Sequence, residues 1–193
     1  LQSVTWFIYD EPVRNPFPVV GIIGAGQLAR MTVAPAIALG VTLKLFAQDK
    51  NDSAAQICDH VVGDFRSLEE VSAFARDCDV VTFEHELVPL SVIKGLEAEG
   101  VRVYPPSSAF VYSQDKAQMR KVLNDLPSPQ WQLITDETEV YSFPVIAKAI
   151  SGGYDGRGVW KISSTDMLAE IIAINPQLLI EELVDFDSEI AVM

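Results

Sequence analysis

A lysine followed by a glycine-rich loop is the part of the sequence best suited to chemistry. Lys148 ends the stretch FPVIAK, and residues 151–158 read SGGYDGRG before the next apolar run, VWKI. Two strands joined by a loop with four glycines and an arginine could fold over a polyphosphate. The loop lacks a Gly-Lys-Ser/Thr ending and no helical pattern follows it, so it is neither a Walker loop nor the start of a dinucleotide-binding unit. The alternative is an exposed hairpin whose turn is made by Asp155 and Gly156.

A second candidate site lies where a predicted strand, residues 19–23, runs into the motif GAGQLA and a helix ending at Leu39. Gly24 and Gly26 allow a tight turn, and the free N–H groups of the helix attract an anion. Asp49 follows at about the distance at which a dinucleotide fold places its ribose-binding acid. NAD binding is therefore one interpretation, and close packing of a helix on a strand is the other.

A third candidate is the carboxylate of Glu84. It follows a strand predicted over residues 79–83, at the edge of a parallel sheet where ligands bind. A carboxylate in this place could hold sugar hydroxyls. The alternative is a solvated turn before Pro89.

Composition limits the classes of partner. The chain has 14 Lys and Arg against 27 Asp and Glu, a formal net charge of −13, which argues against non-specific binding to nucleic acid or anionic membranes. No apolar run reaches the ~18 residues that a membrane span needs. Cys58 and Cys78 show no CxxC spacing and no secretory signal is present, so we expect a reduced, cytoplasmic setting. With only His60 and His85 beside them, we expect no zinc site and no cysteine nucleophile.

The pattern of elements predicts two domains. Strands at 19–23, 41–46, 79–83 and 101–104 alternate with helices at 27–39, 67–78 and 90–98, which indicates a doubly wound α/β unit. Residues 1–18 are interpreted as an N-terminal arm or extension and not as a signal peptide.

From Ser107 a helix is predicted to Leu126, followed by the breaker LPSP, which we interpret as a linker or boundary. The segments after it predict an antiparallel sheet with one helix: strands at 130–134, 143–149, 159–162 and 178–184, and a helix at 165–174. Residues 187–193 look like an interrupted strand. Because this second domain would leave an apolar face uncovered, we expect the chain to be incomplete.

Six stretches, in order, resemble the 5-(carboxyamino)imidazole ribonucleotide synthase family of ATP-grasp enzymes in purine biosynthesis. They read VVGIIGAGQLARM, VVTFEHELVP, YPPSSAFVYSQDKAQMRKVL, PSPQW, FPVIAKAISGGYDGRGVWKI and LLIEELVDFDSEIAVM. The resemblance implies a Rossmann-like pre-ATP-grasp domain without a dinucleotide over residues 19–106, and the first part of an α+β ATP-grasp domain over 107–193. The formate-dependent glycinamide ribonucleotide transformylase and the biotin carboxylases, in the same fold class, also combine a glycine loop with a nucleotide-binding hinge strand. The stretches TFEHELVP and SGGYDGRG favour the synthase.

The resemblance also implies roles for individual residues. Lys148, Tyr154 and Arg157 are the expected catalytic residues. The expected ATP contacts are Lys116, Lys148, the loop residues Gly153, Tyr154, Asp155, Gly156, Arg157, Gly158 and Val159, the hinge residues Glu181, Glu182, Leu183 and Val184, and the ribose-binding Glu189. The expected contacts to the aminoimidazole ribonucleotide are Gln27, Leu28, Glu84, Tyr154 and Arg157, the last two closing over this substrate or over bicarbonate.

The implied reaction is carboxylation of the ribonucleotide with ATP and bicarbonate through carboxyphosphate. The resemblance implies that the magnesium ligands lie after Met193, so we expect no metal ligand among these 193 residues. We also expect these residues alone not to turn over substrate. The implied partners are small molecules, with neither nucleic acid nor membrane, and the full-length protein is expected to be a homodimer. The alternative from another class is an NAD(P)-binding oxidoreductase, or a non-catalytic nucleotide-binding module, that uses Gly24, Gly26 and Asp49.

Overall fold

The computed structural model describes residues 17–140, 142–153 and 156–191. The chain divides between Pro105 and Pro106 into two compact units, which we describe separately. The sequence analysis places the division one residue later. Of the expected N-terminal arm, residues 1–16 lie outside the described part of the chain. The expected linker at 126–129 is a loop within the second unit.

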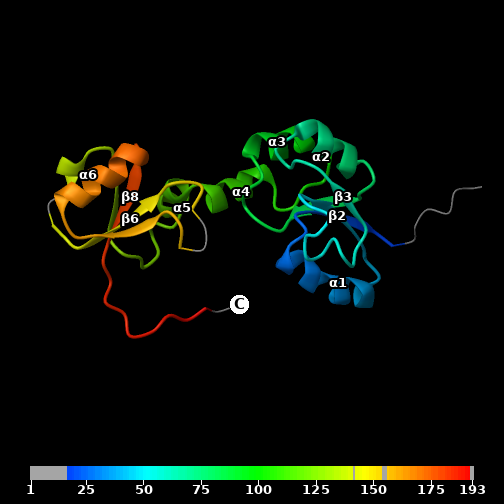
Figure 1. The fold of residues 1–193 in the computed structure, drawn as a ribbon, viewed down its shortest axis with the longest axis horizontal. Coiled ribbons are helices and arrows are strands. Elements are labelled where there is room, and N and C mark those ends of the chain that lie inside the picture. Colours follow the sequence, from blue (N-terminus) through cyan, green and yellow to red (C-terminus); the bar gives the residue numbers. More distant parts are fainter. Residues whose placement is uncertain (1–16, 141, 154–155, 192–193) are drawn as a thin grey trace, which may run out of the picture. The chain divides into compact units, whose positions relative to one another are not determined.

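The first unit is a parallel four-stranded sheet in the order β3-β2-β1-β4, with α1 on one face and α2 and α3 on the other (Figure 1). This arrangement confirms the predicted α/β fold. Buried residues on both faces, among them Ile22, Leu45 and Val81, form its core. The elements are β1 (Val19–Ile23), α1 (Gln27–Leu39), β2 (Thr42–Ala47), β3 (His60–Val62), α2 (Leu68–Ala75), β4 (Val80–Phe83) and α3 (Leu90–Ala98).

Three details of this unit differ from expectation. Strand β3 was not predicted, because its three residues are half-buried or exposed and give no buried apolar run. The strand expected at 101–104 is reduced to a single bridge between Val81 and Val103. Helix α2 ends three residues earlier than predicted. Its cap Ser67 accepts from the Glu70 N–H, and the Glu70 carboxylate accepts from the Asp64 N–H.

The second unit is an antiparallel sheet in the order β5-β8-β6-β7, as predicted. Helix α6 covers one face, and its Leu168 belongs to the same buried cluster as Val145, Ala147 and Ile180 of the sheet. Ser164 caps this helix by accepting from the Met167 N–H. The elements are α4 (Ser107–Gln114), α5 (Lys116–Val122), β5 (Trp131–Ile134), the 3₁₀ turn η1 (Glu137–Glu139), β6 (Val145–Ala149), β7 (Val159–Ile162), α6 (Thr165–Ile174) and β8 (Leu178–Glu182).

Two predictions for this unit are wrong. The single helix expected from Ser107 to Leu126 is broken at Asp115, whose backbone is extended and whose carboxylate caps α5 by accepting from the Gln118 N–H. Asp favours this N-cap role over a helix interior because its side chain competes for backbone N–H groups. Residues 187–191 form no strand; after β8 the chain runs as an exposed, irregular segment (Figure 1).

In the described part of the chain, no helix is both long and apolar enough to cross a membrane.

Candidate functional site

In the first unit, the carboxylate of Glu84 occupies the N-terminus of α1. Strand β4 delivers Glu84, and its Oε2 accepts from the Gly26 N–H at 2.6 Å, while Oε1 accepts from the N–H groups of Leu28 and Ala29 at 3.0 and 3.2 Å. Helix α1 has no side-chain cap of its own. Glu84 is half-buried and hydrogen-bonded, so the solvated-turn interpretation is wrong.

The two glycines of the GAGQLA motif make room for this carboxylate. A Cβ on Gly26 would lie 2.7 Å from Glu84 Oε1, and a Cβ on Gly24 would lie 2.6 Å from both Glu84 Cβ and Oε2. Gly24 also has φ +119°, which side-chain-bearing residues rarely adopt. The motif is therefore explained by close packing within the protein.

Among the described residues, a cavity of about 360 Å³ in the second unit and one of about 260 Å³ in the first unit are each lined in part by predicted residues. The smaller one is lined by Gly24, Ala25, Gly26, Leu28, Gln48, Asp52, Glu84 and His85. It thus contains two carboxylates and no lysine or arginine. Leu28 and Glu84 both line it, whereas Gln27 lies at its side, exposed, and accepts from the Ser53 hydroxyl at 3.3 Å.

This geometry argues against a dinucleotide. In such folds the pyrophosphate takes the place at the helix N-terminus that the Glu84 carboxylate fills here. Asp49, the candidate ribose ligand, instead accepts from the Asn51 N–H at 2.7 Å within a turn.

In the second unit, Lys148 and Glu181 come together on adjacent antiparallel strands. Ile146 of β6 pairs with Glu181 of β8, so Lys148, two residues further along, projects from the same face of the sheet. The Lys148 ammonium forms an ion pair with Glu181 Oε2. The Glu181 side chain is only 4% exposed, and the structure thus contains a buried carboxylate directly beside the proposed phosphate-binding lysine.

A third member of this group, Arg120, was missed by the sequence analysis. Its Nε donates to Glu181 Oε1 at 2.7 Å and its Nη2 forms an ion pair with the same oxygen. One signal could have found it: Arg120 lies four residues after Lys116 and therefore on the same side of α5. We name Arg120, Lys148 and Glu181 the charge triad.

The glycine loop closes a hairpin between β6 and β7, and Lys116 is attached to it. At its base the Ala149 N–H donates to Gly158 O at 2.8 Å. The Lys116 N–H donates to Ile150 O at 3.0 Å, and Lys116 Nζ donates to Gly153 O at 3.4 Å. The structure therefore brings Lys116 and Gly153 together.

The remaining loop residues are only partly described. Tyr154 and Asp155 lie outside the described residues, and Gly156, Arg157 and Val159 are exposed. Three glycines of the loop have positive φ: Gly152 (74°), Gly156 (78°) and Gly158 (73°).

Of the four expected hinge residues, 181–184, only the first two belong to strand β8. Glu182 ends β8 and its Oε1 accepts from the Gln130 N–H at 2.9 Å, which ties β8 to β5. Leu183, Val184 and Glu189 are exposed and belong to the irregular segment after β8.

Among the described residues, no group of three or more His, Cys, Asp or Glu is placed to hold a metal ion, so none is assigned to magnesium.

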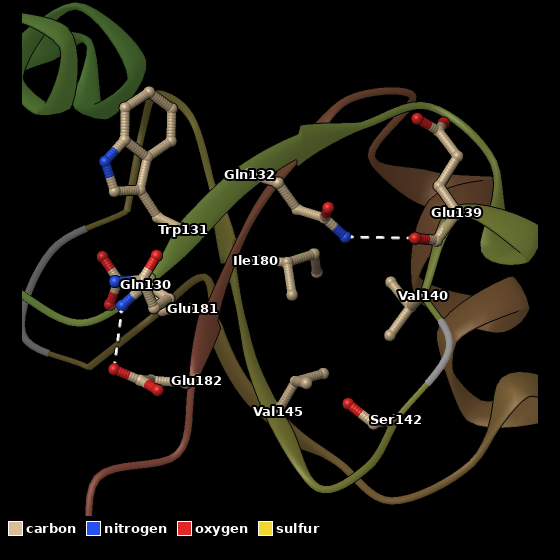
Figure 2. Close-up of a pocket in the computed structure, with 10 residues that line it drawn as sticks. All are labelled: Gln130, Trp131, Gln132, Glu139, Val140, Ser142, Val145, Ile180, Glu181 and Glu182. Atoms are coloured by element: carbon tan, nitrogen blue, oxygen red, sulfur yellow. Dashed lines mark hydrogen bonds between the residues drawn. The ribbon is translucent and has the colours of Figure 1, made fainter.

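The larger cavity lies mainly on the face of the sheet opposite Lys148. Val145 and Ile180 form its apolar floor, and the Gln132 amide, which donates to Glu139 O at 3.1 Å, closes one side (Figure 2). Because residues alternate along β6, Val145 and Lys148 project from opposite faces. Glu181 and Trp131, which also line the cavity, lie on the same face as Lys148, so the cavity reaches the edge of the charge triad.

Two family models match successive parts of the chain, with their boundary after residue 114, later than the division between Pro105 and Pro106. A family model described as the ribonucleotide synthetase pre-ATP-grasp domain matches residues 18–114, and one for the ATP-grasp domain matches residues 118–193. The N5-carboxyaminoimidazole ribonucleotide synthase of Mycobacterium tuberculosis is 38% identical over 189 residues, covering 91% of this chain and 44% of the relative. The chain spans about half the length of the curated relatives it matches.

Solved structures agree as well. The carboxyaminoimidazole ribonucleotide synthase of Aspergillus clavatus complexed with ATP matches with a TM-score of 0.78 at 28% identity, over 90% of this chain and 49% of that one. A complex from the same organism with ADP and 5-aminoimidazole ribonucleotide matches with a TM-score of 0.76 at 26% identity, over 90% and 48%. The resemblance drawn from the sequence motifs is confirmed. With the pre-ATP-grasp match covering about half of its residues and the ATP-grasp match following directly, the chain belongs to the ribonucleotide synthetase family of ATP-grasp proteins.

Proposed function

We propose that the protein carboxylates 5-aminoimidazole ribonucleotide with ATP and bicarbonate, giving 5-(carboxyamino)imidazole ribonucleotide, ADP and phosphate in purine biosynthesis. The observation that carries the proposal is the charge triad, which holds Lys148 on the antiparallel sheet next to the base of the glycine loop. The same function is supported by the names of the relatives and by the two solved structures that are complexed with ATP, or with ADP and 5-aminoimidazole ribonucleotide.

The second unit is the proposed ATP site. Lys148 and Lys116 would supply positive charge to the phosphates, and the loop residues 153–159 would cover them. Glu181 would accept from the adenine amino group, and the backbone of Leu183 or Val184 would pair with a ring nitrogen. The carboxylate of Glu189 would bind the ribose hydroxyls, and Glu182 belongs to the same hinge.

The first unit is the proposed ribonucleotide site. The Glu84 carboxylate has about four acceptor positions, of which three take backbone N–H groups, so one on Oε2 is left for a hydroxyl of the substrate. Gln27 and Leu28 lie next to it at the start of α1. An acidic cavity suits hydroxyl and amine donors better than a phosphate.

The proposed chemistry begins with attack of a bicarbonate oxygen on the γ-phosphorus of ATP, with ADP leaving. The carboxyphosphate formed breaks down to carbon dioxide and phosphate, and the amine of the ribonucleotide captures the carbon dioxide with loss of a proton. Such phosphoryl transfer needs mainly positioning and charge neutralisation. Closure of the loop, with Tyr154 and Arg157, would exclude water from the labile intermediate, and magnesium is proposed as the cation that accompanies ATP.

Ligand-induced thermal shifts test this function against its NAD-binding alternative. We expect ATP with magnesium and 5-aminoimidazole ribonucleotide each to raise the melting temperature, and NAD to leave it unchanged, because Glu84 fills the pyrophosphate position. Stabilisation by NAD alone would refute the proposal.

The proposal also includes cytoplasmic localisation and, for the whole protein, a homodimer. Both cysteines are free thiols in the structure, as in a reducing compartment. Light scattering coupled to size-exclusion chromatography measures the mass of the assembly, and a mass equal to one chain would contradict the dimer.

A further inference from the structure

Two cations of the charge triad share one buried carboxylate, so the group carries an excess positive charge. Arg120 holds Glu181 Oε1 with two of its nitrogens, and Lys148 contacts Oε2 alone. The two oxygens of one carboxylate are thus divided between two partners. Charges this deeply buried are stable only when they are paired.

The two cations differ in how firmly they are held. The Arg120 side chain is 15% exposed and its planar guanidinium makes two contacts to one oxygen. The Lys148 side chain is 25% exposed and makes one contact through a flexible stem. An ammonium on such a stem can turn to another anion with little hindrance, whereas a guanidinium held through two nitrogens cannot. Of the two, Lys148 is therefore the cation that can leave for another anion.

We propose that Arg120 is a positioning residue that keeps Glu181 paired and oriented when Lys148 moves to the nucleotide phosphates. The move would free Oε2 while Oε1 stays bound to Arg120. The freed oxygen then becomes a fixed acceptor for an exocyclic amine, which adenine has at position 6. Guanine has a carbonyl oxygen there, which a carboxylate would repel. The inference rests on the proposed ATP site and adds to it the residue that makes the site selective for adenine.

The electrostatic balance explains why Arg120 is needed. Without it, Lys148 and Glu181 form a neutral pair, and moving Lys148 to a phosphate would leave a carboxylate that is 4% exposed without any partner. Breaking a buried pair in this way is costly, and the cost would be subtracted from the binding of ATP. With Arg120 present, the carboxylate remains paired throughout.

The test compares the affinities of ATP and GTP, each with magnesium, by isothermal titration calorimetry. We expect the unmodified protein to prefer ATP. Arg120→Met should weaken ATP binding by about tenfold and reduce the ATP preference, which corresponds to losing one strong buried contact. Arg120→Lys keeps the charge but loses the second nitrogen contact to Glu181. Its ATP affinity and its ATP preference should lie between those of the unmodified protein and of Arg120→Met. Lys121→Met is the matched control: it removes the same charge from an exposed neighbour on α5, and both affinities should stay within about twofold.

The change in nucleotide preference separates positioning from a merely structural role, which would leave the ratio unchanged. Arg120→Met should remain folded without nucleotide, because Lys148 still neutralises Glu181; its melting temperature checks this. If it does not fold, Arg120→Lys serves as the test variant. An unchanged ratio of ATP affinity to GTP affinity in Arg120→Lys overturns the inference. If Arg120→Met binds like Lys121→Met, the inference fails while the ATP site stands. If the unmodified protein binds no ATP, the proposed function fails, and this inference with it.

Discussion

The carboxylate of Glu84 lies against the backbone of Gly26, 2.6 Å from Oε2 to the amide nitrogen. In a dinucleotide-binding fold, a phosphate would take this place at the helix N-terminus. Here the protein supplies the anion itself, from the end of β4. The glycine motif therefore serves a contact between two elements that lie 58 residues apart in the sequence.

Alanine substitutions at Gly24 and Gly26 test this explanation of the motif. Gly26 has an ordinary φ of −83°, so Gly26→Ala should cost only the displacement of the Glu84 carboxylate, about 1 kcal/mol of unfolding free energy. Gly24→Ala should cost about 2–3 kcal/mol, because it adds backbone strain at φ +119° and a contact with Glu84 Cβ. Urea denaturation measures both.

A double substitution provides the control. In a Glu84→Ala background, Gly26→Ala should become nearly neutral because the carboxylate it displaces is gone. Gly24→Ala should remain destabilising there, since a Cβ at position 84 and the strained backbone both persist. Equal costs of Gly26→Ala with and without the Glu84 carboxylate would contradict the steric explanation.

Glu84→Ala should itself destabilise the first unit by about 1–2 kcal/mol, because three N–H groups at the start of α1 lose their acceptor. Glu84→Gln should cost less, since one oxygen remains to accept from Leu28 and Ala29. The control is Glu99→Gln, an exposed acid at the C-terminal end of α3, where loss of the charge should not destabilise. Denaturation midpoints at low and high salt measure the stability of the three variants. A Glu84→Ala variant as stable as Glu99→Gln would show that the Glu84 carboxylate does not stabilise the start of α1.

The regular elements were predictable where the local pattern was strong. Helix α3 has the predicted bounds, because an apolar face and the stop at Gly100 both indicate them. The break at Asp115 was missed because the helical pattern continues on both sides of it. Only the contact of its carboxylate with the Gln118 N–H shows that the capping preference prevailed.

The sites were predictable only in part, because their central contacts join distant segments. The lysine and the glycine loop are adjacent in sequence, and the motif resemblance extended the site to Glu181. Arg120 looks like an ordinary surface cation of a helix, and its partner lies 61 residues further along. The cap that Glu84 provides was likewise invisible until the sheet placed β4 beside β1.

Gly153→Ala should disturb the glycine loop by direct contact. A Cβ there would lie 2.6 Å from Arg157 O and 3.5 Å from Lys116 Nζ, so the loop could not keep its conformation. Under the proposed function we expect about fivefold to tenfold weaker ATP binding, measured by calorimetry. Gly152→Ala is the comparison, because a Cβ there has open space and only the positive φ opposes it. A larger loss of ATP affinity in Gly152→Ala than in Gly153→Ala would contradict the described loop.

Cys78 should be a slow-reacting thiol. Its burial, which outweighs the opposing effect of Lys44, raises its pKa from an ordinary value of 9.0 to about 11. At pH 8 the thiolate fraction is then about a hundredfold lower than for an ordinary cysteine, and iodoacetamide labelling should slow accordingly. Mass spectrometry of the peptides separates this residue from Cys58. Labelling of Cys78 in the folded protein as fast as in urea would contradict its described burial.

The same shift predicts how stability depends on pH. Because the folded state holds the Cys78 proton more tightly than the unfolded state, its contribution is fully present below pH 9 and is lost as the pH rises towards about 11. Cys78→Ser removes the titration, so the decline in unfolding free energy over this range should become shallower. The Lys44–Asp77 ion pair also weakens in alkali, since the pKa of Lys44 is raised by Asp77 and its deprotonation ends the pairing. The variant should therefore keep a residual decline, and an unchanged slope would mean that Cys78 ionises alike in both states.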